Sequence, residues 1–430
     1  MKTSRSRRSA ARSRRWIAAA ALAACTMPGV RTASAQTVSE RGFVDVRSFV
    51  FPLDAPNDRT NAVADVLARG EIFLKPRAWL EVAAGLDLRA GTHDQVDARW
   101  RVDFADRGAR RPAVSVRRLS ATIARGPVTV DAGRQFIRWG KTDIVTPTDR
   151  FAPRDYLNVV DNEFLPVSGI RAVVQFGAQA IEAVWVPRLT PSRLPLLDQR
   201  WTVVPGAAAG LPIVARGETF PRGASAGIRW SRTGGAVDWS VSAFDGFNHL
   251  PDVAATLAID PAAPGGAEIL VNRTYPVLRS AGGDVAVPTR WFTVKGEAAF
   301  FGSPTPATDE YVLYVVQVER QAGEWVLVGG YAGEAVTERH ASLTFSPDRG
   351  LTRAIVGRAS YTIDTNRSVA FETAIRQNGE GVYGKAEYSQ ARGAHWRFTV
   401  SGVAIAGAED DFLGQYRRNA HVAADLRYSF

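Results

Sequence analysis

The last eleven residues of the chain, AHVAADLRYSF at positions 420–430, alternate in polarity. The even positions carry the apolar side chains Ala420, Val422, Ala424, Leu426, Tyr428 and Phe430. The odd positions carry His421, Ala423, Asp425, Arg427 and Ser429. Because successive side chains of a β-strand point to opposite faces, this segment predicts a strand with one face suited to lipid and the other to water.

The same alternation recurs along the chain, for example at 80–89, 292–300 and 396–401. The alternating segments are bounded by Gly, Pro, Asn or Asp. No long stretch keeps the apolar period of a helix. The pattern predicts strands at roughly 41–51, 62–75, 78–90, 113–125, 127–138, 168–178, 180–188, 223–232, 236–246, 274–286, 290–301, 311–320, 324–335, 352–363, 367–377, 381–390, 395–406 and 418–430.

The connections between these segments decide between a soluble β-sandwich and a membrane barrel, since both show alternation. Tight turns alternate with longer connections, which fall at 91–112, 139–167, 189–222, 247–273 and 336–351. Short turns at one end and long loops at the other are typical of outer-membrane barrels, in which no backbone group is left unpaired in hydrocarbon. We therefore expect an all-β fold: a transmembrane, antiparallel, up-and-down β-barrel of about 18 strands, within a range of 14–18.

Residues 1–35 have the layout of a secretory signal peptide. A basic region precedes an apolar stretch from Trp16 to Ala24, which is too short to span a bilayer. The small residues Ala33-Ser34-Ala35 then precede Gln36. The sequence predicts cleavage after Ala35, so that 36–430 form the barrel, exported to the outer membrane of a Gram-negative cell.

The N-terminus resembles two other kinds of export signal. Leu22-Ala23-Ala24-Cys25 resembles a lipobox, which would make Cys25 a lipidated N-terminus. Ser13-Arg14-Arg15 resembles a twin-arginine signal, but a barrel must cross the inner membrane unfolded, so we interpret that resemblance as accidental. If Ala35 is the cleavage point, the mature chain has no cysteine and depends on no disulfide.

The basic character of the chain belongs almost entirely to its N-terminus. Eight of the 53 basic residues and none of the 43 acidic residues lie in 1–35, which leaves 45 against 43 in the remainder. That balance argues against a nucleic-acid partner. The expected partners are instead outer-membrane lipid and, through the terminal Phe430, the barrel-assembly machinery.

Tryptophans also fit a membrane barrel, because aromatic girdles form where strands meet the membrane interfaces. Seven of them stand at or near the predicted strand ends: Trp79, Trp139, Trp185, Trp230, Trp291, Trp325 and Trp396. We therefore expect these side chains at the two interfaces, although tryptophans in the core of a sandwich would show similar spacing.

The long connection at 139–167 is the candidate functional segment, since loops of this length are usually functional or disordered. It and the end of the preceding strand are dense in both signs of charge. In barrels that conduct solutes, such a loop can fold inward, narrow the lumen and sort solutes by charge. The expected constriction residues are Arg134, Arg138, Lys141, Asp143, Asp149, Arg150, Arg154 and Asp155. The alternative is a salt-bridged loop packed against the rim.

Two motifs carry a resemblance to a known group. The Gly-Arg-Gln-x-x-x-Trp-Gly run at 133–140 and the Phe-Leu-Gly-Gln-Tyr-Arg-Arg-Asn lead at 412–419 resemble a broad, largely uncharacterised family of outer-membrane barrels related to alginate-export proteins. The resemblance implies a porin-like channel or exporter for a small or hydrophobic solute, with an inner-membrane transporter as a partner of some members. The balanced charge departs from the Arg- and Lys-rich pore of alginate exporters and argues against a polyanionic solute.

Other function classes fit the sequence less well. An outer-membrane hydrolase needs a nucleophile and a base within hydrogen-bond reach, yet the five histidines are scattered and no Gly-x-Ser-x-Gly or His-x-x-x-His motif occurs. We therefore expect no enzyme, no metal site and no cofactor. A TonB-dependent receptor needs a plug domain, for which the predicted start of the first strand leaves no room. A structural or adhesive barrel stays open as an alternative.

Overall fold

We describe the protein from a computed structural model, which places residues 37–203, 211–306, 308–339, 343–344 and 346–430. The predicted signal peptide and Cys25 lie outside the described residues. Among the described residues, no helix is long and apolar enough to cross a membrane.

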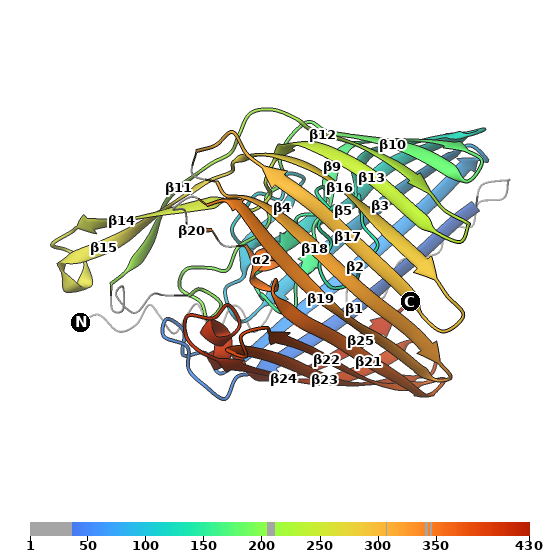
Figure 1. Cartoon of the computed structure of the whole chain (residues 1–430). Coiled ribbons are helices and arrows are strands. Elements are labelled where there is room, and N and C mark those ends of the chain that lie inside the picture. The colour runs from blue at the N-terminus through green and yellow to red at the C-terminus, as the bar shows by residue number, and fades with distance from the viewer. Residues whose placement is uncertain (1–36, 204–210, 307, 340–342, 345) are drawn as a thin grey trace.

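Eighteen strands of the described chain form one closed antiparallel barrel, which confirms the predicted fold class (Figure 1). The barrel closes because the first strand pairs with the last, from Phe43 opposite Ser429 to Val50 opposite Val422. In order around the barrel, the strands are β1 (Thr37–Val50), β2 (Ala62–Arg77), β3 (Leu80–Gly91), β5 (Arg111–Arg125), β6 (Val128–Gln135), β9 (Val167–Phe176), β10 (Gln179–Val186), β12 (Ser225–Arg232), β13 (Asp238–Phe247), β16 (Val277–Pro288), β17 (Thr293–Gly302), β18 (Glu310–Ala322), β19 (Trp325–Glu338), β21 (Ala354–Asp364), β22 (Arg367–Arg376), β23 (Gly381–Arg392), β24 (Trp396–Gly407) and β25 (His421–Ser429).

The predicted alternation sets the direction of the side chains. In β25, Val422 and Leu426 are exposed on the outer wall, whereas His421 is 5 % exposed inside the barrel. Charged residues of other strands, such as Asp87 and Glu297, are likewise buried within the barrel. A wall with an apolar outer face and polar side chains inside fits a hydrocarbon surround, not water.

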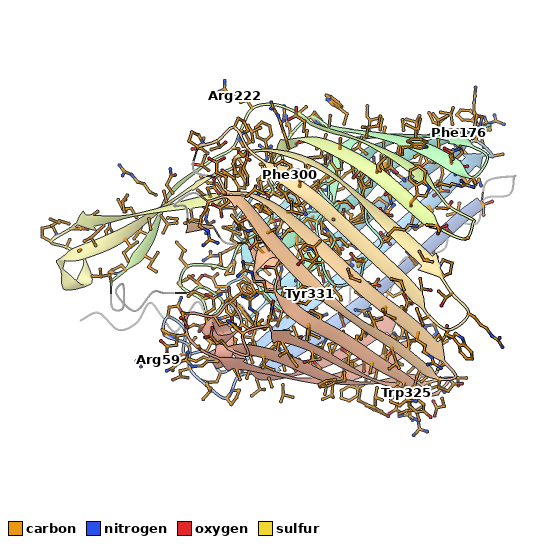
Figure 2. The ribbon with its side chains drawn as sticks, in the orientation of Figure 1. Arg59, Phe176, Arg222, Phe300, Trp325 and Tyr331 are labelled. Atoms are coloured by element: carbon orange, nitrogen blue, oxygen red, sulfur yellow. The ribbon has the colours of Figure 1, made fainter. Side chains whose placement is uncertain are left out.

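One end of the barrel carries only short turns, which we call the turn end. Gly126 and Gly323 adopt positive φ angles in two of these turns, where a side chain would strain the backbone. Phe176 and Trp325 lie at the turn end, and Arg59 lies at the opposite end, which we call the loop end (Figure 2).

Six of the seven predicted interfacial tryptophans are exposed, with fractions of 37–61 %. They are Trp79, Trp185, Trp230, Trp291, Trp325 and Trp396. For the seventh, Trp139, the prediction is wrong. Its side chain is 2 % exposed and its indole N–H donates to Glu182 at 2.8 Å, because the chain turns into the barrel at that point.

The connections at the loop end contain strands that the sequence pattern gave only as long connections. β4 (Val96–Asp103) pairs in parallel with β5. β11 (Ile213–Thr219), β15 (Ala267–Thr274), β14 (Asp252–Ile259) and β20 (Leu343–Thr344) form a separate sheet that projects beyond the barrel (Figure 1). Short helical turns, η2 (Pro264–Gly266), α2 (Pro347–Gly350) and η3 (Gly414–Asn419), complete this end.

Candidate functional site

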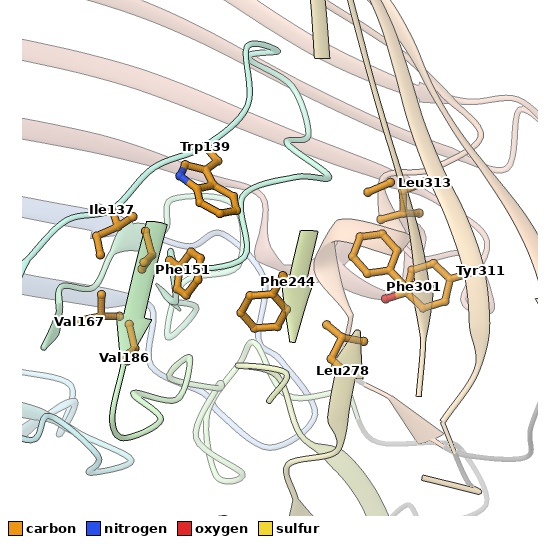
Figure 3. Packing of buried hydrophobic residues seen from close by; sticks show 12 residues of the cluster. Ile137, Trp139, Phe151, Val167, Val186, Phe244, Leu278, Phe301, Tyr311 and Leu313 are labelled. Carbon is orange, nitrogen blue, oxygen red and sulfur yellow. The ribbon is translucent and has the colours of Figure 1, made fainter. Parts of the chain in front are cut away.

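The segment between β6 and β9, residues 136–166, folds into the barrel; we call it the inner loop. Three of its apolar residues, Ile137, Trp139 and Phe151, pack on the wall formed by β9, β10, β13 and β16–β18 (Figure 3). The rings of Trp139 and Phe151 meet edge to face at 5.1 Å, and Phe151 meets Phe244 at 5.2 Å. On β12, a Cβ at Gly227 would approach Trp139 to 2.8 Å, so only glycine lets the loop lie this close to the wall.

One carboxylate of the wall holds the bend of the inner loop. Glu297 of β17 is 3 % exposed and accepts hydrogen bonds from the backbone N–H groups of Lys141, Thr142 and Thr148 at 2.9–3.2 Å. The hydroxyl of Thr148 also donates to it at 2.8 Å, whereas the hydroxyl of Thr142 is shared with the carbonyl oxygen of Val145, which lies 2.6 Å away. Four donors thus converge on one side chain and fix the bend of the loop against the wall. Gly140 is required beside it, because a Cβ there would lie 2.7 Å from the carboxylate.

The later part of the inner loop, residues 154–164, contacts a set of charged residues on the side of the barrel formed by β2, β3, β5 and β6. We call this set the arginine–carboxylate network; two short strands of this part of the loop, β7 (Arg154–Asp155) and β8 (Glu163–Phe164), supply two of its acids. Its members are Arg69, Asp87, Arg89, Asp106, Arg111, Arg134, Asp155, Glu163 and Arg193.

Asp155 is the centre of this network and is 4 % exposed. It accepts from Arg111 at 2.8 Å and from Arg193 at 2.5 Å, and Arg193 pairs in turn with Asp106. Burial alone would raise the pKa of Asp155, but the two guanidinium groups outweigh it and hold the pKa well below its usual range.

Glu163 belongs to the same network and pairs with Arg89 at 3.2 Å and Arg69 at 3.5 Å. Burial raises its pKa, while the charges of these arginines act more strongly together and lower it to about 2. Both acids are therefore ionised at neutral pH. Together with their arginines they fill this side of the lumen with paired charge.

The other side of the lumen is open. A cavity of about 780 Å³, which we call the lumenal cavity, lies between the inner loop and the wall from β17 to β24. Loop residues Asp143, Arg154 and Asp161 face it, as do wall residues Lys295, Glu319, Arg358, Glu372 and Lys385. A second cavity of about 200 Å³, lined by strands β23 to β25, shares Val160, Asp161, Tyr383 and Lys385 with it, so the two meet at this point.

The structure separates the eight predicted constriction residues into two groups. Asp143 and Arg154 line the lumenal cavity. The other six do not line this cavity and contact protein groups: Arg134 and Asp155 lie in the network, Lys141 lies 3.3 Å from Asp238, and Arg150 lies over the ring of Phe301. Arg138 pairs with Asp149, although its side chain is 41 % exposed.

The wall residues Lys295, Glu319, Arg358, Glu372 and Lys385 were not among the predicted site residues. A signal for them exists in the sequence, because each occupies a polar position in an alternating strand. Nothing in one strand, however, shows which inward positions meet open space and which meet the inner loop.

The described histidines are held by structural contacts. His249 lies between the carbonyl oxygens of Thr190 and Arg150, and burial lowers its pKa. His93 pairs with Asp58, and His421 packs against Phe49 and Phe51. Among the described residues, no group of three or more His, Cys, Asp or Glu side chains is arranged to hold a metal ion.

Comparisons with known proteins show the fold. No protein-family model and no curated protein matches the chain. Among solved structures, a BenF-like porin from Pseudomonas fluorescens Pf-5 is 9 % identical, with a TM-score of 0.53 over 92 % of this chain and 98 % of that chain. OccAB4 of Acinetobacter baumannii is 9 % identical, with a TM-score of 0.53 over 92 % and 99 %. OpdQ of Pseudomonas aeruginosa is 8 % identical, with a TM-score of 0.51 over 93 % and 99 %. The chain is thus a porin-like β-barrel in fold.

Proposed function

We propose that the chain is an outer-membrane channel that gives solutes a passive pathway through the lumenal cavity. One observation carries the proposal: the inner loop fills one side of a closed barrel and leaves a cavity of about 780 Å³ along the charged wall on the other. An inward-folded loop beside charged side chains is the arrangement by which pores narrow and select. The fold shared with porins supports the same function.

In this proposal the inner loop forms the constriction, through Asp143 and Arg154 together with Asp161. The remaining predicted residues, Arg134, Arg138, Lys141, Asp149, Arg150 and Asp155, hold the loop in place. The outer membrane is the proposed location, with lipid around the apolar wall and assembly by the barrel-assembly machinery through Phe430. We also propose that the chain belongs to the family related to alginate-export proteins. Its proposed partner is a transporter in the inner membrane.

The test is electrical. We expect refolded residues 36–430 to give discrete current steps in a planar lipid bilayer. Ser360→Trp places a large ring in the cavity, because Ser360 lines it and is only partly buried, and should lower the step size. Ile375→Trp is the matched control on the outer wall, where Ile375 is 42 % exposed, and should leave the step size unchanged. Equal steps from both variants would place the pathway elsewhere.

A structural or adhesive barrel is the second candidate, and one observation favours it. The sheet of β11, β14, β15 and β20 projects from the loop end, and Leu257 and Ile259 on it are 68 % and 87 % exposed. Exposed apolar side chains of this kind are common at contact surfaces. A barrel with only that role would insert into the bilayer and carry no current.

A further inference from the structure

The lumenal cavity is lined by two kinds of side chain. Partly buried apolar residues come from both of its sides: Ile144 and Val160 belong to the inner loop, and Val328 and Val356 belong to the opposite wall. Water and small ions gain nothing from such a surface. A solute with apolar area gains about 25 cal/mol for each Å² that it buries there.

The charged side chains that face the cavity are balanced and mostly paired. Four acids and four bases line it. Lys295 lies 3.0 Å from Asp143 and 2.7 Å from Glu319. Arg358 lies 3.0 Å from Glu372.

The remaining charged groups of the cavity also have partners. Lys385 lies 3.0 Å from Glu387, and Asp161 lies 2.6 Å from Arg47. Arg154 stacks on the ring of Phe164 at 4.1 Å and donates to Asn162 at 2.9 Å.

Paired charges act on a solute as dipoles, not as an excess of one sign. A solute with net charge would lose hydration on entering and meet, apart from the guanidinium of Arg154, only charges that already have an ion-pair partner. An uncharged solute loses less, can accept or donate hydrogen bonds at the ion pairs, and still buries its apolar part against the valine and isoleucine side chains. The cavity therefore suits an uncharged molecule that has one apolar and one hydroxylated part.

We infer that the pathway favours uncharged amphiphilic solutes, such as aryl or alkyl glycosides, over charged solutes of the same size and over plain sugars. This inference rests on the proposed function, since it assigns a solute class to the same cavity. Val328 and Val356 determine the preference through their apolar contact with the solute, and the ion pairs Lys295–Glu319 and Arg358–Glu372 keep the cavity free of net charge.

The experiment measures efflux from proteoliposomes loaded with one of four probes. Phenyl β-glucoside is uncharged and has an apolar ring, and maltose is uncharged and lacks one. Phenyl β-glucuronide adds a negative charge to the same body, and phenyl 2-amino-2-deoxy-β-glucoside adds a positive one. Burying about 55 Å² of the ring would favour phenyl β-glucoside over maltose by about tenfold in rate. Liposomes without protein correct for leakage through lipid.

The double variant Val328→Thr, Val356→Thr replaces apolar contacts by hydroxyl-bearing side chains and should lower the ratio of phenyl β-glucoside to maltose efflux toward one. Val369→Thr makes the same kind of change on the outer wall, where Val369 is 37 % exposed, and should keep the wild-type ratio. Taking the ratio within each variant removes differences in the number of inserted barrels.

Three results would overturn the inference. They are a charged probe that leaves fastest, equal rates for phenyl β-glucoside and maltose, and a ratio that the double variant leaves unchanged. Absence of both efflux and current for the folded protein would instead overturn the proposed function, so the two failures are distinguishable.

Discussion

The two sides of the lumen use the same residue types in opposite ways. On the side of β2, β3, β5 and β6, arginines and carboxylates are packed against the inner loop, and Arg193 and Asp155 are 5 % and 4 % exposed. On the side of β17–β24, similar ion pairs border open space, and the side chains of Arg358 and Asp143 are 55 % and 59 % exposed. Burial, not residue type, thus separates charges that hold the loop from charges that a solute can meet.

The comparison predicts its largest effect at Asp155. Removing one partner of a buried ion pair leaves the other charge unpaired, so Asp155→Ala should cost about 3–5 kcal/mol of unfolding free energy. Glu372→Ala, on the open side, removes the partner of Arg358, whose side chain is 55 % exposed, and should cost less than about 1 kcal/mol. Urea unfolding in detergent micelles measures both variants, and equal losses would remove the distinction between the two sides.

Glu297 should show the next largest effect. In Glu297→Ala, the three backbone N–H groups and the Thr148 hydroxyl that it binds lose their acceptor, at a cost of about 2–4 kcal/mol for the attachment of the loop. The bend at 141–148 would leave the wall, so single-channel current should become larger and noisier. Glu319→Ala removes a wall carboxylate that does not hold the loop, and a similar gain in noise for that variant would contradict the account.

Acid should release the same loop. Glu163 has a folded pKa of about 2, below its usual 4.5, so its contribution to stability is complete above the unfolded value and is lost as pH falls through the folded value. The pKa of Asp155 is lowered as well, so it adds to the same window. Single-channel current should keep its step size from pH 8 down to about pH 5 and become unsteady between about pH 4 and pH 2. A transition near neutral pH would show that other groups control the loop.

Arg154 should show the smallest effect. Arg154→Gln removes one partly buried cation that lines the cavity and should shift the reversal potential in a salt gradient toward cations, by roughly twofold in permeability ratio. Arg138→Gln, which changes a cation paired with Asp149 away from the cavity, should leave it unchanged. Equal shifts would mean that the pathway also touches Arg138.

Alternation in the sequence predicted the strands, because the period of a strand is set by the backbone alone, and the pattern of short and long connections predicted that the strands close into a membrane barrel. All eighteen predicted strands are present within a few residues of their expected ends. The candidate site was only partly predictable. Local charge density marked the inner loop, but which charges face open space depends on contacts such as that of Glu297 with Thr148, 149 positions apart in the chain. Trp139 was misplaced for the same reason, since its neighbour Gly227 lies far along the sequence.

The most direct test of the open and filled sides uses two matched serine-to-cysteine variants. Residues 36–430 contain no cysteine, so each variant carries a single thiol. Ser360 lines the lumenal cavity, whereas Ser115 is 7 % exposed on the filled side. With a cationic methanethiosulfonate reagent added during single-channel recording, Ser360→Cys should show one irreversible drop in current and Ser115→Cys none. A drop for Ser115→Cys, or an unaltered current for Ser360→Cys, would contradict a pathway along β17–β24.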